Sequence, residues 1–287
     1  MKFAFIEQSL AAEYPVDACC QVLQVSRSGY YASLERPVSV RAQRRQELAA
    51  KIQEVHQQNR QVYGSPRICQ ALNAQGHKVC QNTVADIMKQ RDIRAKTKKK
   101  FVPRTTDSNH QQPVAENLLD RQFTACLPNQ KWVADITYIP TDEGWLYLAG
   151  VMDLCSRKLV GWSMADHMRV DLVADALGMA LQRRRPGAGL LHHSDRGVQY
   201  ASDDYLHMLQ DAGSQVSMSG KGDCWDNAAM ESFWSTLKTE LVHHQQYATH
   251  AEARASIFEY IEVFYNRKRL HSSLGYQSPE AFEASLN

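Results

Sequence analysis

The chain has 287 residues, a formal net charge of +2 and a hydrophobic share of 44%, which is ordinary for a globular protein. Its apolar runs fall short of the roughly 20 residues that span a bilayer, and the apolar start before Glu7 is too short for a signal peptide. Seven cysteines without a Cys-x-x-Cys pair indicate reduced thiols and argue against a structural zinc site, so we expect a cytoplasmic protein without a membrane partner.

The small net charge hides a strong asymmetry along the chain. Residues 1–104 carry 18 basic and 8 acidic side chains, whereas residues 105–287 carry 15 basic and 23 acidic ones. The basic peak is residues 89–104, with eight basic side chains and one acid. A basic front end on an acidic body predicts a module that binds a polyanion, although a solvated basic linker remains an alternative.

The basic front end is expected to be helical. Residues 15–34 predict two short helices around a tight turn, with Pro15 at the first helical position and Ser26 as a cap, in a weak helix-turn-helix pattern. Three further helices follow up to residue 104. Ser65 is expected to cap the second of them, and the third is expected to start at Asn82 or Thr83. Helices that end in Lys and Arg favour a helix-turn-helix that approaches DNA, and a plain three-helix bundle is the alternative.

Residues 105–118 form a polar stretch, which we interpret as a linker, and after it the sequence pattern changes from helical to β-rich. Three adjacent β-rich runs, "KWVADITYIP", "GWLYLAGVMDLC" and "RKLVGWSMAD", predict an antiparallel meander. Helical and strand patterns then alternate, so the order βββαβαβα predicts an α/β layered domain. A last helix opens with the capping box Thr249-x-x-Glu252 and ends in basic residues.

Three carboxylates occupy comparable places in this α/β pattern. Asp135 lies within the first strand, Asp195 ends the fourth, and Glu231 sits in the helix "DNAAMESFWSTLK", with 35 residues between it and Asp195. Strand ends and nearby helices converge at one edge of such a sheet. Three acids at that edge would repel one another unless hard cations such as Mg²⁺ or Mn²⁺ joined them, and two such ions suit phosphoryl transfer. Taken one at a time, Asp135 could be a solvated acid on an edge strand, and Glu231 could be an exposed acid on the surface of a helix.

Together these segments resemble a known family. "WVADITYI", "HHSDRGVQY" and "GDCWDNAAMESFWSTLKTE" are similar to the catalytic core of the insertion-sequence transposases of family three, which are relatives of retroviral integrases. The spacing of 35 residues before the glutamate and the lysine seven positions after it, Lys238, follow that family's pattern. "YNRKRLHSSLGYQSPEAF" and "RQVYGSPRICQALNAQG" resemble its C-terminal signature and its helix-turn-helix region.

The resemblance implies a fold and a site. The fold would be a ribonuclease H-like α/β core, with a mixed five-stranded sheet and flanking helices, behind all-α helix-turn-helix modules. Asp135, Asp195 and Glu231 would be the catalytic acids and would bind two Mg²⁺ or Mn²⁺ ions. Water would cut a phosphodiester at an inverted-repeat end, and the freed 3′-hydroxyl would attack another phosphodiester.

The expected partner is double-stranded DNA, both the terminal inverted repeats and the target. Lys238 would lie near the scissile phosphate. Other expected DNA contacts are Arg196, Lys89, Arg91, Arg94, Lys96, Lys98, Lys99, Lys100, Arg267, Lys268 and Arg269. The roles of His192 and His193 stay open between hydrogen bonding within the fold and DNA contact, and Trp234 and Tyr200 are expected to be packing residues.

The expected division of the chain has five parts: residues 1–40 (helical segment), 41–104 (helix-turn-helix), 105–125 (linker), 126–241 (catalytic core) and 242–287 (C-terminal helix and basic tail). The resemblance further implies a homo-oligomer on DNA, association with the bacterial nucleoid, and a partner or fusion encoded by an upstream reading frame. Two alternatives are a DNA-binding regulator with an inactive core, which the presence of all three acids disfavours, and a nuclease for RNA–DNA hybrids. A nuclease for RNA–DNA hybrids would not explain the basic helical modules.

Overall fold

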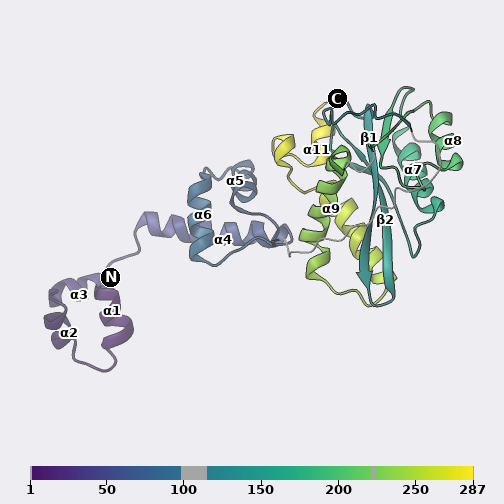
Figure 1. Ribbon diagram of the computed structural model, residues 1–287. Coiled ribbons are helices and arrows are strands. Elements are labelled where there is room, and N and C mark those ends of the chain that lie inside the picture. Colours follow the sequence, from purple (N-terminus) through teal and green to yellow (C-terminus); the bar gives the residue numbers. More distant parts are fainter. Residues whose placement is uncertain (1, 98–114, 221–223, 287) are drawn as a thin grey trace. The chain divides into compact units, whose positions relative to one another are not determined.

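The computed structural model describes residues 2–97, 115–220 and 224–286 (Figure 1). The chain divides into two compact units, Met1–Glu54 and Val55–Asn287. The boundary between the units falls within one helix, α4 (Val40–Gln58). The five-part division of the sequence is finer than this, and it stays a prediction.

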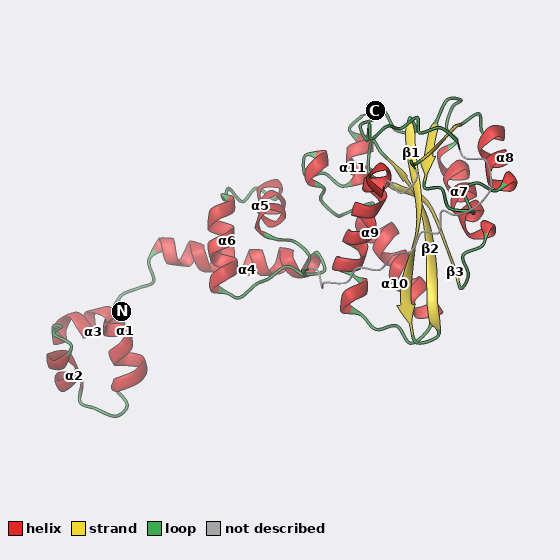
Figure 2. Cartoon of the chain, viewed as in Figure 1, coloured by secondary structure: helices red, strands yellow, loops and turns green. Residues whose placement is uncertain are grey.

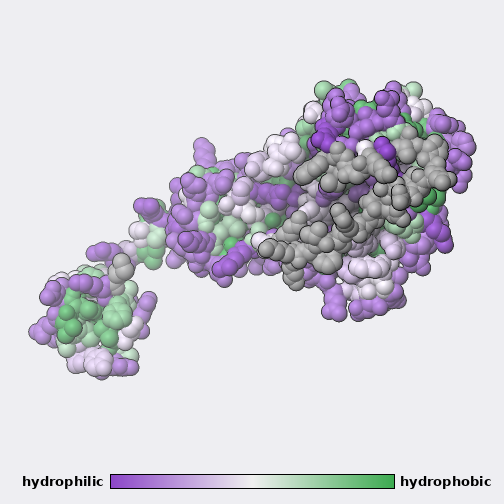
Figure 3. Space-filling model, in the orientation of Figure 1, coloured by the Kyte–Doolittle hydropathy of each residue, from purple (hydrophilic) through white to green (hydrophobic). Residues whose placement is uncertain are grey.

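The first unit is helical. Its elements are α1 (Lys2–Phe5), the π-helical η1 (Ile6–Leu10), α2 (Val16–Val22), α3 (Arg27–Glu35) and the first part of α4. The side chain of Ser26 accepts a hydrogen bond from the amide of Gly29, which confirms the predicted cap, whereas Pro15 is the residue before α2 and not its first. Ile6 and Tyr30 lie in a small core of this unit. Figure 3 shows apolar surface gathered on the same unit, and Val22, at 81% exposure, is among its exposed side chains.

The second unit begins with a helical module that contains α5 (Ser65–Ala74) and α6 (Gln81–Gln90). Pro66 lies in the first turn of α5, but Gly64 is the N-cap, so Ser65 is inside the helix and does not cap it. Helix α6 starts one residue earlier than expected, after Cys80. The apolar faces of both helices are buried through Ile68, Leu72, Val84 and Ile87, as the helical periodicity requires.

The rest of the second unit is built around a five-stranded sheet in the order β3-β2-β1-β4-β5 (Figure 2). Its strands are β1 (Lys131–Thr141), β2 (Gly144–Asp153), β3 (Leu159–Ala165), β4 (Leu191–Ser194) and β5 (Gln215–Met218). The first three form the predicted antiparallel meander, and β4 and β5 run parallel to β1. The strand and helix order βββαβαβα is confirmed.

Helices cover both faces of the sheet. Helices α7 (Val170–Arg184) and α8 (Asp203–Asp211) pack on one face, over a core that includes Trp132, Leu177 and Leu209. Helices α9 (Ala228–Glu240), which follows the short η2 (Cys224–Asn227), and α10 (His250–Phe258) pack against β1 from the opposite face (Figure 2). This places α9 directly beside the central strand.

The chain ends in short elements on the α9 side. They are η3 (Val242–His244), the π-helical η4 (Glu259–Tyr265) that continues α10, η5 (Ser272–Leu274) and α11 (Pro279–Ala284). The predicted cap of α10 is confirmed, because Thr249 Oγ1 accepts from the amide of Glu252 at 3.1 Å. Glu252 Oε2 accepts from the amide of Ala248 at 2.9 Å, one residue before the amide that a capping box would use. Within the described residues, we find no helix with the length and apolarity needed to cross a membrane.

Candidate active site

Asp135 lies in the middle of β1, the central strand of the sheet. Its Oδ2 accepts a hydrogen bond from Trp234 Nε1 of α9 at 3.0 Å, and its Oδ1 accepts from the amide of Ile136 at 2.8 Å. Gly150 is opposite Asp135 on β2, and a Cβ there would lie only 2.9 Å from the Trp234 ring. The absence of a side chain at Gly150 therefore gives the indole room to reach the carboxylate.

Asp195 follows β4 and lies near Asp135. Ala134 of β1 pairs in parallel with Ser194, the last residue of β4, so Asp135 and Asp195 each come one residue after this pair. Asp195 Oδ1 accepts from the amide of Gly197 at 2.9 Å. Burial, and next the negative charge of Asp195, raise the pKa of Asp135 to about 8. The two carboxylates are thus close enough for one to oppose ionisation of the other.

Glu231 is in the first turn of α9, which packs on β1. Asn227, just before this helix, donates from Nδ2 to the carbonyl of Ala134 at 3.0 Å and so ties the start of α9 to β1 beside Asp135. The Glu231 side chain is exposed, and its charge also contributes to the raised pKa of Asp135. In the part of the chain that the structure describes, no three His, Cys, Asp or Glu side chains form a ready-made metal cluster.

Comparisons with known proteins identify the family. The integrase core domain family matches residues 126–224, a second integrase core domain profile matches 212–279, and an HTH-like domain matches 43–101. Transposase InsF for insertion sequence IS3A of Escherichia coli is 46% identical over 285 residues, which cover 99% of this chain and 98% of that protein. The chain belongs to the IS3-family transposases. It is a polynucleotidyl transferase that cleaves and transfers DNA strands.

Further similarities extend beyond that relative. An insertion element IS600 protein of 31 kDa from Shigella sonnei is 48% identical over 263 residues, covering 92% of the transposase and 96% of that protein. A simian T-cell lymphotropic virus intasome chain has a TM-score of 0.47 at 13% identity, with 81% of the transposase and 74% of that chain covered. The HTLV-2 integrase catalytic core domain in complex with magnesium has a TM-score of 0.41 at 14% identity, with coverage of 55% and 97%.

Lys238 of the transposase lies two turns after Glu231 on α9. Its Nζ is 4.6 Å from the centre of the Tyr138 ring on β1, within the range of a cation–π contact. Burial lowers the pKa of Lys238, and the charge of Asp135 opposes that effect. Lys238 therefore shares α9 with Glu231 and lies close enough to Asp135 for their charges to interact.

The two histidines before Asp195 form hydrogen bonds within the fold. His192 Nε2 is 3.1 Å from the Tyr205 hydroxyl, and His193 Nδ1 is 2.8 Å from Ser217 Oγ on β5. Both side chains are buried, and burial lowers the pKa of His192 to about 3 and that of His193 to about 4. These buried hydrogen bonds answer the question that the sequence left open, because both histidines bind within the fold.

The other basic residues differ widely in their surroundings. Lys89 and Arg91, at the end of α6, are exposed, and Arg94 pairs with Asp92 at 2.8 Å. Burial, and next the charge of Arg60, lower the pKa of the half-buried Lys96. The guanidinium of half-buried Arg196 donates to the carbonyl of Ser219. Three predicted contacts lie outside the described residues: Lys98, Lys99 and Lys100.

The three basic residues at the C-terminal signature separate into two kinds. Arg267 and Lys268 are exposed, and Arg267 lies 3.6 Å from Glu280. Arg269 is only 4% exposed, and its guanidinium binds Glu240 through Nε at 2.8 Å and Nη2 at 2.7 Å. The structure thus gives Arg269 an internal partner in place of the DNA contact expected from its sequence.

Sequence reasoning missed three positions that shape the site. Trp234 was expected only to pack, yet its indole binds Asp135, and Asn227 and Gly150 were not singled out. A signal for Trp234 existed, since it lies three residues after Glu231 and so on the same face of α9. Tyr200 is 2% exposed within the sheet core, which confirms packing there.

Proposed function

We propose that Asp135, Asp195 and Glu231 are the catalytic acids of this transposase and that together they hold Mg²⁺ or Mn²⁺, two ions in the reacting complex. The donor set fits such ions, because carboxylate oxygens are the ligands that hard divalent cations prefer. The observation that carries the proposal is the pair Asp135 and Asp195 on neighbouring strands, where burial and mutual repulsion raise the pKa of Asp135 to about 8. A cation between these groups would relieve the repulsion.

The contacts around the acids support a preorganised arrangement. The indole of Trp234 and the amide of Ile136 each occupy one oxygen of Asp135, so its carboxylate has a set orientation. The amide of Gly197 does the same for one oxygen of Asp195. When bound, a divalent cation would neutralise negative charge on the attacked phosphate and on the attacking and leaving oxygens. Lys238 would bind a DNA phosphate beside the acids as a point charge.

The proposed reaction consists of two transfers at phosphorus. Water attacks a phosphodiester at the element's end, so that a phosphorus–oxygen bond forms and the 3′-oxygen leaves as a hydroxyl. That 3′-hydroxyl then attacks a phosphodiester of another strand segment, forming the new bond and releasing a second 3′-oxygen. The proposed DNA is the terminal inverted repeat in the first step and target DNA in the second.

Exposed basic side chains away from the three acids support the proposed phosphate contacts. Lys89 and Arg91 at the end of α6, and Arg267 and Lys268 near the C-terminus, are exposed. Such side chains supply the salt-dependent part of DNA affinity. A homo-oligomer on DNA, nucleoid association and an upstream-frame partner stay predictions from the family resemblance.

The test of the acids is Asp195→Asn, with Asp204→Asn on α8 as a control that removes an exposed carboxylate elsewhere on the core. We expect Asp195→Asn to lower cleavage and strand transfer of a labelled terminal-repeat duplex a thousandfold or more in Mg²⁺ and in Mn²⁺, since losing several kcal/mol at about 1.4 kcal/mol per tenfold has that effect. Duplex binding should be nearly unchanged. Cleavage by Asp195→Asn at close to the wild-type rate would place the metal site elsewhere.

A further inference from the structure

Residues 259–276, which comprise η4, η5 and the chain between and after them, are anchored on the catalytic core. Asn266 makes a reciprocal pair of hydrogen bonds with the backbone of Leu159 on β3, each of 3.0 Å. The hydroxyl of Tyr265 donates to the carbonyl of Arg157 at 3.1 Å. Both side chains are buried, so this face of the segment is part of the core.

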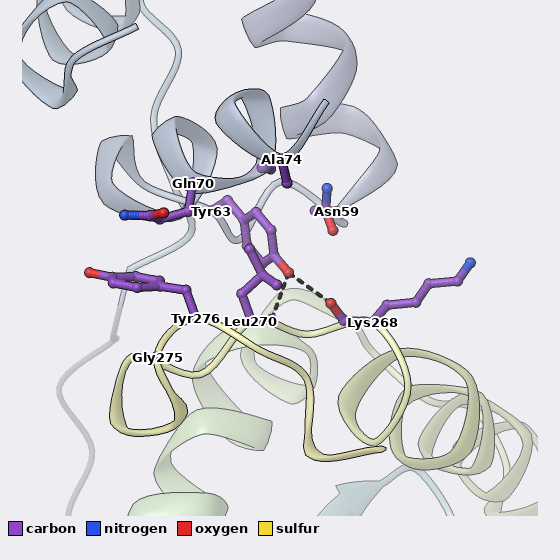
Figure 4. A pocket seen from close by; sticks show the side chains of 9 residues that line it. Asn59, Tyr63, Gln70, Ala74, Lys268, Leu270, Gly275 and Tyr276 are labelled. Atoms are coloured by element: carbon purple, nitrogen blue, oxygen red, sulfur yellow. Dashed lines mark hydrogen bonds between the residues drawn. The ribbon is translucent and has the colours of Figure 1, made fainter. Parts of the chain in front are cut away.

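The opposite face of the segment holds the helical module of residues 55–96. Tyr63, between α4 and α5, is 1% exposed. Its hydroxyl accepts from the amide of Leu270 at 2.8 Å and donates to the carbonyl of Lys268 at 3.2 Å (Figure 4). One side chain of the module thus satisfies two backbone groups of the segment.

Charged contacts accompany the tyrosine. Arg60 Nη1 lies 3.0 Å from Glu259 Oε1, and the Arg60 guanidinium lies 5.8 Å from the centres of the Tyr260 and Phe264 rings. The Arg60 side chain is 21% exposed and that of Glu259 is 59% exposed, so solvent screens the ion pair from the side of the glutamate. The aromatic rings of Tyr260 and Phe264 give the Arg60 guanidinium further contacts on the segment.

A third contact reaches the helix of the catalytic site. Glu240, the last residue of α9, is bound by Arg269 and accepts from the Tyr260 hydroxyl at 2.8 Å. Arg67 of α5 lies 3.7 Å from the same carboxylate. Glu240 is two residues after Lys238 and nine after Glu231, so the module contacts the helix that carries both.

These contacts combine hydrogen bonds and ion pairs with contacts to aromatic rings. Beside Tyr63 the seam between the module and the segment opens into a cleft of about 410 Å³, lined on one side by Gln70 and Ala74 and on the other by Lys268 and Tyr276 (Figure 4). The attachment thus includes polar contacts made by named side chains, and single substitutions can test them.

We propose that residues 259–276 and Glu240 form a seat that holds the module of residues 55–96 at a set distance from the catalytic acids, with Tyr63 and Arg60 as its positioning residues. The inference rests on the proposed function, because its consequence is that a DNA end bound by the module reaches the acids in one register. The seat explains why Arg269 and Glu240 are buried as a pair beside the site. It also gives the C-terminal signature a role in positioning.

The test measures a distance in the full chain. Cys80 in the module and Cys126 in the core are both exposed, and four other cysteines, Cys19, Cys20, Cys69 and Cys155, are buried. With Cys224 replaced by serine, spin labels on Cys80 and Cys126 report the separation of module and core by pulsed electron paramagnetic resonance. We expect one narrow distance distribution for this reference protein.

Substitutions at the seat should change that distribution. Arg60→Glu places two carboxylates together and should broaden it at least twofold, and the charge-swapped double variant Arg60→Glu/Glu259→Arg should narrow it again. Tyr63→Phe should also broaden it. Its matched control is Tyr205→Phe, because Tyr205 is equally buried and its hydroxyl is also hydrogen-bonded, but to His192 within the core and away from the seat. This control should match the reference.

Cleavage position provides the second readout. On a labelled terminal-repeat duplex, Arg60→Glu should spread the cuts over neighbouring phosphodiesters and lower the share at the main position at least fivefold, and the charge-swapped variant should restore it. A broad distribution in the reference protein, a narrow one in Arg60→Glu, or broadening that the second substitution does not reverse would overturn the seat. The distance between the two spin labels does not depend on the catalytic acids. A failure of the proposed function would therefore be seen in a different experiment, as cleavage by Asp195→Asn.

Discussion

Replacing Asp135 by asparagine should change how the stability of the core depends on pH. In the folded protein, burial and the charge of Asp195 raise the pKa of Asp135 from an ordinary 3.8 to about 8. An asparagine side chain keeps the shape and can still accept a hydrogen bond from Trp234, but it does not titrate in this range. The variant therefore isolates the contribution of this one carboxyl group.

The sign follows from proton binding. Between about pH 4 and pH 8 the folded state keeps the proton of Asp135, whereas the unfolded chain has released it. The free energy of unfolding therefore falls as pH rises, by about 1.4 kcal/mol per pH unit for one proton. From pH 5 to pH 7 the wild-type protein should lose roughly 3 kcal/mol through this group, and Asp135→Asn should not.

The measurement is urea unfolding at pH 5, 6 and 7 in buffer with a chelator, followed by tryptophan fluorescence. All five tryptophans lie between residues 132 and 234, so the signal reports on the core. Asp204→Asn is the control and should keep the wild-type slope. Added Mg²⁺ should stabilise the wild-type protein most at pH 7, where it competes with the fewest protons. Parallel pH dependences of the wild type and Asp135→Asn would refute the reasoning.

Three more predictions concern side chains around the site. Lys238→Ala should weaken engagement of the cut DNA end more than metal binding, so rising DNA concentration should partly rescue strand transfer, and a defect that no concentration repairs would contradict this. Trp234→Phe removes the hydrogen bond to Asp135, and a hydrogen bond to a charged group is worth about 1.5–3 kcal/mol. The cleavage rate should therefore fall about tenfold, and the pH profile of cleavage should move to higher pH. An unchanged rate and profile would mean that Trp234 only packs in the core. Lys89→Ala with Arg91→Ala should lower the slope of log affinity against log salt by about 0.9 for each lost phosphate contact in a filter-binding titration, and an unchanged slope would mean that α6 does not contact DNA.

Local patterns in the sequence were enough to predict the elements of the core. The β-rich run around Asp135, the antiparallel meander and the cap at Thr249 each depend on residues close together in the chain, and each has the structure that the pattern predicts. The apolar residues before the two histidines also predict a strand, and Asp195 directly follows that strand, β4. Such features depend on backbone geometry and short-range hydrogen bonds, which nearby residues control.

The partners of the polar side chains were decided only by the tertiary structure. A lysine or arginine run looks alike in sequence whether it faces solvent or a buried acid, and Arg269 differs from Lys268 only because Glu240, 29 residues earlier, lies against it. Likewise Trp234 binds Asp135 across 99 residues. A buried charge or indole N–H is stable only where a distant segment supplies its partner, so its role depends on packing that no local pattern records.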